Sequence, residues 1–123
     1  MIRATFILSV LLMMIACRSS KQHLVGNDRD AHGCIGSAGY QWSELQQNCV
    51  RPFELPLIIK HSDSITQIAV LFSTDSSKAE VFAIEGHFML QRKPSQLHSH
   101  HWKNNKMQLN KNYSGNWIWE KSN

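Results

Sequence analysis

The sequence predicts a mainly β fold, a small antiparallel sheet or partly open barrel of five to six strands, with one short disulfide-bracketed helix near the N-terminus. From residue 55 onward, short apolar runs alternate with polar turn segments, which is typical of an antiparallel meander. The length of 123 residues, of which 42% are hydrophobic, gives room for one modest core. No long stretch carries a helical period, so no long helix competes with the strands.

Six segments are expected to form the strands. Turns between them are marked by Thr74–Ser77, by Glu85-Gly86 and by a longer polar loop over Asn110–Asn116. Pro94 and its polar neighbours interrupt the fourth strand, which makes Gln91–Ser99 a loop or an edge. The expected strands are Leu57–Ile59, Thr66–Phe72, Ala79–Ile84, Phe88–Gln91, His101–Leu109 and Trp117–Trp119.

The first sixteen residues have the pattern of a cleavable export signal. Met1–Arg3 carry one positive charge, and Ala4–Ala16 are apolar apart from Thr5 and Ser9. A helix over this apolar stretch would cover about 20 Å, against roughly 30 Å for the hydrocarbon core of a bilayer. A lasting transmembrane anchor is therefore the poorer interpretation, and we expect residues 1–16 to be a signal peptide.

The stretch ends in Met14-Ile15-Ala16-Cys17, which resembles the lipobox of bacterial lipoproteins, with Met14 in place of the usual Leu. The resemblance implies that Cys17 receives the lipid, palmitate among its acyl chains, and becomes the new N-terminus. Acyl chains contribute about 0.8 kcal/mol per buried CH₂, so several would hold the protein at a membrane. The alternative is an ordinary secretory signal with Cys17 unmodified.

The resemblance also implies a location in the bacterial cell envelope, with the domain outside the cytoplasm, for example in the periplasm. Arg18 stands where an Asp is associated with inner-membrane retention in enterobacteria. We therefore expect the outer membrane rather than the inner one.

The cysteine count predicts one disulfide. Of three Cys, setting Cys17 aside leaves Cys34 and Cys49, an even pair in an oxidising compartment. A metal or redox pair is the alternative, but CxxC spacing is absent and only two thiols remain. Residues 17–27 then form a lipidated polar tether and residues 28–123 a single disulfide-bearing β-rich domain. Within the bracket we expect the short helix over Gln41–Asn48.

The bracketed segment Asp28–Glu54 reads DRDAHGCIGSAGYQWSELQQNCVRPFE. It resembles a cysteine-bracketed motif, DxDxHGC followed by SAGYxWS and a closing CxR, of small envelope lipoproteins of Bacteroidota. The resemblance covers about a fifth of the chain and implies an envelope location and a disulfide, without an activity. Asp28, Asp30 and His32 could bind Ca²⁺ or Zn²⁺, but Asp and His beside Gly in a turn more often cap backbone amides.

A lipid-anchored, disulfide-bearing set of short antiparallel strands is similar in outline to the membrane-bound C-type lysozyme inhibitors, small β-barrels that insert a loop into the lysozyme cleft. The inhibitory loops of that family have no match here, and a chain of formal charge +4 suits a cationic lysozyme poorly. We therefore expect a non-catalytic envelope module that binds a protein or a glycan. A periplasmic inhibitor of a hydrolase such as lysozyme is the alternative.

No catalytic arrangement is recognisable in the sequence. There is no GxSxG turn, and Glu80 and Glu85 point to opposite faces of one strand, which does not suit a glycosidase pair. We expect no enzymatic activity and no cofactor. The basic residues form no block, so nucleic acid is not an expected partner of an exported chain.

Two clusters are candidate sites. His98 and His100 lie on one side of an extended chain and could share Zn²⁺, Cu²⁺ or Ni²⁺ with a third ligand; the alternative is a polar loop whose histidines change charge in mildly acidic media. Trp117 and Trp119 share one face of the last strand. They could form a platform for a sugar, although such a pair more often closes the core of a small β domain.

Overall fold

The fold is mainly β and antiparallel, as predicted. A computed structural model describes residues 28–60, 65–93 and 100–123. Within them, seven strands form one antiparallel meander and two more form a separate hairpin. In chain order the elements are η2 Gly36–Ala38, β1 Gln41–Ser43, β2 Asn48–Val50, η3 Pro52–Glu54, β3 Leu57–Lys60, β4 Gln67–Phe72, β5 Lys78–Ala83, β6 Gly86–Gln91, β7 His101–Lys103, β8 Met107–Lys111 and β9 Trp117–Lys121.

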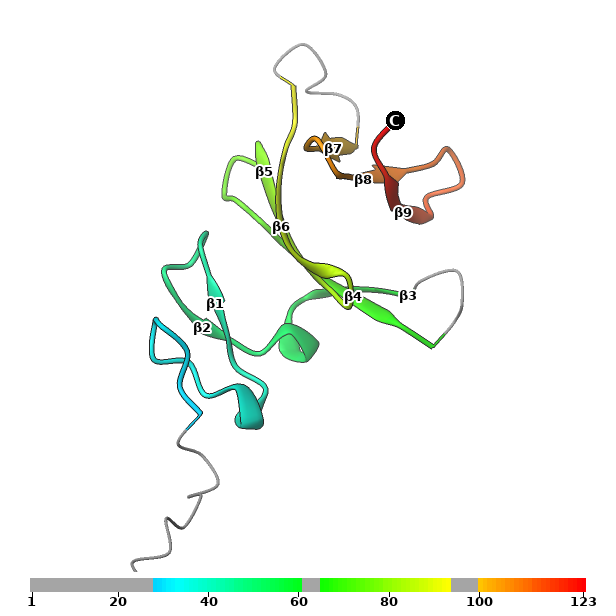
Figure 1. The fold of residues 1–123 in the computed structure, drawn as a ribbon. Helices are drawn as coiled ribbons and strands as arrows, with labels where there is room; N and C mark the ends of the chain where they lie inside the picture. Colours follow the sequence, from blue (N-terminus) through cyan, green and yellow to red (C-terminus); the bar gives the residue numbers. More distant parts are fainter. Residues whose placement is uncertain (1–27, 61–64, 94–99) are drawn as a thin grey trace, which may run out of the picture.

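Each strand of the meander pairs with the next one in the chain, from β3 to β9. Figure 1 shows the β1–β2 hairpin on one side of β4–β6 and strands β7–β9 on the other. The three predicted turns lie between strands: Thr74–Ser77 joins β4 to β5, Glu85 precedes Gly86 at the start of β6, and residues 112–116 join β8 to β9.

The core lies on one face of the meander, because apolar residues recur at every second position of each strand. We call this the inner face. Its buried members are Ile59, Ile68, Val70, Ala79, Val81, Leu90, Trp102, Met107, Leu109 and Trp119. A smaller apolar cluster lies on the outer face, where Val50 of the hairpin strand β2 packs with Ala69 and Phe82 of the sheet. The strands β4 and β5 are therefore covered on both faces.

The helix expected over Gln41–Asn48 is wrong in its placement, because this stretch forms the β1–β2 hairpin, with Trp42 opposite Cys49. Its turn is held by a hydrogen bond in which the Ser43 hydroxyl accepts from the Gln46 N–H at 3.0 Å. Gln47 then adopts a φ of 51°, a conformation that a right-handed helix does not contain. The short helical element inside the bracket is instead the 3-10 turn η2.

The single strand expected over His101–Leu109 is divided into β7 and β8. The Asn104 carboxamide oxygen accepts hydrogen bonds from the N–H groups of Lys106 and Met107, both at 2.8 Å. An Asn side chain that accepts a hydrogen bond from the backbone N–H two residues later stabilises a turn. The sheet thus has seven strands in the described residues, where five to six were expected.

The predicted disulfide between Cys34 and Cys49 is confirmed, with a Cα–Cα distance of 5.5 Å and a sequence separation of 15. The acidic residues beside it cap the loop. Asp30 accepts hydrogen bonds from the N–H groups of His32 and Cys34, at 2.8 and 2.9 Å. Asp28 does the same for Ser37, and the hydrogen bond from the Ser37 hydroxyl lowers the pKa of Asp28.

A buried carboxylate joins the disulfide segment to the sheet. Glu80 of β5 points to the outer face and is completely buried. Its oxygens accept hydrogen bonds from the Ser43 hydroxyl at 2.6 Å and from the N–H groups of Glu44 and Leu45 at 2.7 and 3.3 Å. On the other side, His87 Nε2 of β6 lies 2.8 Å from Glu80 Oε1. The hairpin turn is therefore docked on a side chain that lies 35 to 37 residues further along the chain.

The charge of Glu80 reflects two opposing effects. Burial raises its pKa, because a charged carboxylate loses its hydration. The hydrogen bonds from His87, Ser43, Glu44 and Leu45 outweigh this effect, so the pKa of Glu80 lies below its ordinary value of 4.5. The group is consequently ionised at neutral pH.

The signal peptide expected over residues 1–16 and the tether expected over residues 17–27 lie outside the described residues. Among the residues that are described, none belongs to a helix with the length and apolar character needed to cross a membrane.

The disulfide gives a first prediction. Replacing both Cys34 and Cys49 by Ser should lower the free energy of unfolding by about 3 kcal/mol, because the closed loop no longer restricts the unfolded chain. Urea unfolding followed by circular dichroism measures this. The reduced wild-type protein is the matched control and should unfold at the same urea concentration as the double variant. A double variant as stable as the oxidised protein would contradict the conclusion that this disulfide stabilises the fold.

The buried carboxylate gives a second prediction. Glu80→Gln puts an NH₂ group where a carboxylate oxygen accepts hydrogen bonds, and should lower the free energy of unfolding by about 2 to 4 kcal/mol at pH 7. Glu85→Gln, in the exposed β5–β6 turn, is the matched control and should change stability by less than about 0.5 kcal/mol. Urea unfolding of the three proteins provides the comparison.

The same variants predict a pH dependence. Because the pKa of Glu80 is lower in the folded than in the unfolded protein, its stabilising contribution is complete above pH 4.5 and is lost as the pH falls through the folded-state pKa. The difference in unfolding free energy between wild type and Glu80→Gln should therefore shrink below pH 4.5. A difference that stays constant between pH 7 and pH 3 would show that Glu80 does not titrate in this way.

Candidate functional site

The structure describes only some of the residues that the sequence selected as candidate sites. Cys17 and His98 lie outside the described residues, and His100 is exposed just before β7. Within the part of the chain that is described, no group of three His, Cys, Asp or Glu side chains could hold a metal ion. Trp119 is buried in the core, 7% exposed, whereas Trp117 is half-buried. The two indoles of β9 therefore have different surroundings.

Trp117 belongs to an aromatic cluster at one end of the sheet. Its ring centre lies 5.8 Å from that of Phe72, the last residue of β4, and 6.0 Å from that of Trp102 in β7. Phe72 and Trp102 are themselves 4.8 Å apart, with their planes tilted by 45°. Tilted contacts at these distances are favourable for aromatic rings. Trp119 instead packs against Phe88, at 5.6 Å.

Basic side chains surround this aromatic cluster. The guanidinium carbon of Arg92 lies 4.7 Å from the ring centre of Trp102, and the Lys111 ammonium lies 5.3 Å from that of Trp117. Both are cation–π contacts, which attract a positive charge to the face of an indole. The His100 ring meets Trp102 edge-on at 6.3 Å. Three basic groups and three aromatic rings are thus brought together from strands distant in the sequence.

The β4–β5 turn provides the polar anchor of the cluster. Ser76 has a φ of 55°, and its carbonyl oxygen accepts hydrogen bonds from Trp102 Nε1 and Arg92 Nη2, both at 2.9 Å. The Asp75 carboxylate holds this turn, accepting hydrogen bonds from the hydroxyls of Ser73 and Ser77. These bonds, with that from the Ser77 N–H, lower the pKa of Asp75 to about 2. The turn that the sequence indicated therefore orients a carbonyl toward the site.

The cluster surrounds a cavity of about 240 Å³, which we call the aromatic cavity. Pockets for drug-sized ligands are usually about 300–1,000 Å³, so this one matches a single ring better than an extended ligand. It is lined by Phe72, Ser76, Arg92, His100, Trp102, Lys111 and Trp117. Apolar ring surface, basic groups and one carbonyl meet there, which suits a ligand with both an apolar face and polar substituents.

Sequence reasoning found Trp117 and His100 but missed the rest of the aromatic cavity. The available signal was the two-residue period of the strands, since side chains at alternate positions share a face. Arg92 continues the inner-face series of Phe88 and Leu90, and Lys111 continues that of Leu109. The strand ends that carry Arg92 and Lys111 are then brought together by the register of the strands, which cannot be read from the sequence.

The structure also gathers Ser43, Glu80 and His87, the three side-chain types of a hydrolase triad. Their order differs from a triad, because the carboxylate lies between the other two and Ser43 donates its proton to Glu80 rather than to His87. Ser43 is completely buried. Its hydroxyl therefore cannot reach a substrate, and the geometry is that of a docking contact.

Comparison of the chain with protein-family models, with curated proteins and with solved structures gave no match.

Proposed function

We propose that the protein is a non-catalytic, lipid-anchored module of the bacterial cell envelope that binds a glycan in the aromatic cavity. The observation that carries the proposal is the placement of Trp117, Phe72 and Trp102 around an open cavity whose rim bears Arg92, Lys111 and His100. A sugar ring offers a C–H face and a hydroxyl edge. The aromatic rings of the cavity suit the C–H face, and its basic groups suit the hydroxyl edge.

The aromatic side of the cavity suits the C–H face of a sugar. The faces of aromatic rings are electron-rich and attract the weakly positive hydrogens of such a face. Trp117 and Phe72 are half-buried, so part of each ring remains open to a ligand, whereas Trp102 is only 2% exposed and supports them from behind. The basic groups at the rim donate hydrogen bonds to hydroxyl or carboxylate oxygens.

The same lining supports binding without turnover. Among the seven described residues that line the aromatic cavity, none is Asp or Glu. Most glycosidases need a pair of carboxyl groups beside the scissile bond, one as acid and the other as base or nucleophile. A glycan held in this cavity would therefore meet ring faces and hydrogen-bond donors, and no such pair.

The anchor in the proposal rests on the sequence and on cysteine pairing. Cys34 and Cys49 are bonded to each other. Of the three cysteines, only Cys17 is left, and it stands in the lipobox-like Met14-Ile15-Ala16-Cys17. A lipid on Cys17 would hold the domain at a membrane, so that the aromatic cavity could engage a polymer of the envelope.

Glycan binding predicts a spectroscopic response of particular tryptophans. In ¹H–¹⁵N NMR spectra of the full chain in zwitterionic detergent, peptidoglycan fragments, chitohexaose or maltohexaose should shift the indole N–H signals of Trp102 and Trp117. The signal of Trp42, on the β1–β2 hairpin, is the internal control and should stay in place. If none of the three glycans shifts Trp102 or Trp117, the proposal fails.

Two variants locate the binding. Trp117→Ala should raise the dissociation constant at least tenfold, about 1.4 kcal/mol, because it removes the accessible ring. Lys111→Gln should weaken binding without disturbing the core, since this side chain is exposed. Trp42→Ala and Lys121→Gln are the matched controls, and the melting temperature reports whether each variant folds. Binding unchanged in both test variants would exclude the aromatic cavity as the site.

The anchor gives a separate prediction. In a bacterial host supplied with labelled palmitate, the full chain should incorporate the label and Cys17→Ala should not, because the other two cysteines are paired with each other. Gel electrophoresis followed by detection of the label provides the measurement. Met14→Leu, which restores the usual lipobox residue, is the positive control. Label in Cys17→Ala would refute lipid attachment at this residue.

A further inference from the structure

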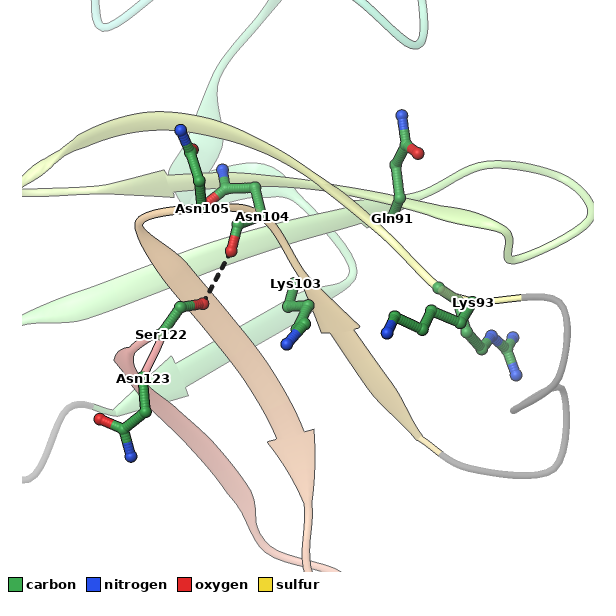
Figure 2. Close-up of a pocket in the computed structure, with 8 residues that line it drawn as sticks. Gln91, Lys93, Lys103, Asn104, Asn105, Ser122 and Asn123 are labelled. Carbon is green, nitrogen blue, oxygen red and sulfur yellow. Dashed lines mark hydrogen bonds between the residues drawn. The ribbon is translucent and has the colours of Figure 1, made fainter.

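A second cavity, of about 450 Å³, lies near the junction of β6 and β7 (Figure 2). We call it the basic cavity, because Arg92, Lys93 and Lys103 line it. Leu90 and Trp102 are buried in the core. Lys103 is the neighbour of Trp102 on its strand, so it points to the opposite, outer face. The basic cavity is therefore separate from the aromatic cavity, although Arg92 borders both.

The cavity forms where the sheet is weakly joined. Strands β6 and β7 pair through a single residue position, Gln91 with Lys103. The Asn104 backbone and side chain hold the adjoining wall: Nδ2 donates to the Met89 carbonyl at 3.1 Å, and the Asn104 carbonyl accepts from the Ser122 hydroxyl at 2.8 Å. Figure 2 shows the second of these bonds and the Lys93 side chain extended toward Lys103. The wall is thus fixed by hydrogen bonds.

The two lysines of this cavity have no acidic side chain beside them. None of the eight described residues that line it is Asp or Glu. Across the described part of the chain, neither Lys93 nor Lys103 forms an ion pair, and Glu120 of the nearby β9 instead accepts hydrogen bonds from the Gln108 and Asn110 amides. A concave site lined by one sign of charge concentrates ligands of the opposite sign.

The cavity is larger than an inorganic ion requires and also offers amide groups. Gln91 and Asn105 line it, and the side chain of neither forms a hydrogen bond to another described residue. Carboxamides both donate and accept, which matches the hydroxyl groups of a polyol. Lysine and arginine side chains commonly bind phosphate groups in proteins. Charge, size and amides together favour a phosphorylated polyol over a bare anion.

We propose that the basic cavity binds the phosphate ester of a polyol, with Lys93 and Lys103 around the phosphate and Gln91 and Asn105 toward the hydroxyls. The phosphate can come from a soluble polyol phosphate or from a phospholipid headgroup of glycerol type. The proposal is independent of glycan binding in the aromatic cavity.

The test is an NMR titration of the full chain in zwitterionic detergent with glycerol 3-phosphate, and in a second arm with micelles that contain phosphatidylglycerol. Backbone N–H signals of residues 91–93 and 103–105 should shift in at least one arm. The arm that responds identifies the source of the phosphate. Glycerol alone is the neutral control and should leave these signals unchanged.

Charge variants make the test specific. Lys93→Gln and Lys103→Gln should each raise the dissociation constant at least threefold, and the double variant at least tenfold. Lys60→Gln, at the end of the edge strand β3, removes the same charge elsewhere and should change the dissociation constant by less than twofold. The proposal is overturned if neither arm shifts the signals, if glycerol shifts them equally, or if Lys60→Gln weakens binding as much as Lys103→Gln.

Discussion

The buried carboxylate of Glu80 determines how the two parts of the chain fit together. A charge without water is costly unless hydrogen bonds replace its hydration. Here the donors come from Ser43, Glu44 and Leu45 in the hairpin turn and from His87 on the next strand. The hairpin can therefore take only the position in which its turn faces Glu80. The disulfide, which ties the loop before η2 to β2, then holds the rest of the N-terminal segment in place.

Docking of the hairpin has consequences for the sheet. Val50 covers Ala69 and Phe82 on the outer face, so β4 and β5 are buried on both sides. The inner face of the same strands packs against β7–β9, which supply Trp102, Met107, Leu109 and Trp119. These bulky residues fill the space between the two halves of the meander. The rings that do not fit within the core, Trp117 and Phe72, remain half-exposed at its end and become the wall of the aromatic cavity.

The features that could be predicted from the sequence are those that depend on the local pattern of residues. Alternating apolar residues and polar turns identified the strands β3 to β6 and β9, and cysteine parity identified the disulfide. The hairpin could not be recognised, because the stretch Gln41–Asn48 has helix-forming Glu, Leu and Gln, and its strand pairing is imposed by Glu80 and Cys34 from outside the segment. The two cavities were likewise hidden, because they depend on the register between β6, β7 and β8.

Alternation of side chains explains how one short stretch borders two different cavities. After Leu90, which is buried in the core, Gln91 and Lys93 point to one face while Arg92 follows Leu90 to the other. Arg92 is fixed there by Ser76 and by the face of Trp102. Four of the thirteen Lys and Arg residues, which form no block in the sequence, are in this way gathered into two local sites: Arg92, Lys93, Lys103 and Lys111. Both proposed sites depend on where the strand register places the basic residues, and net charge alone does not indicate them.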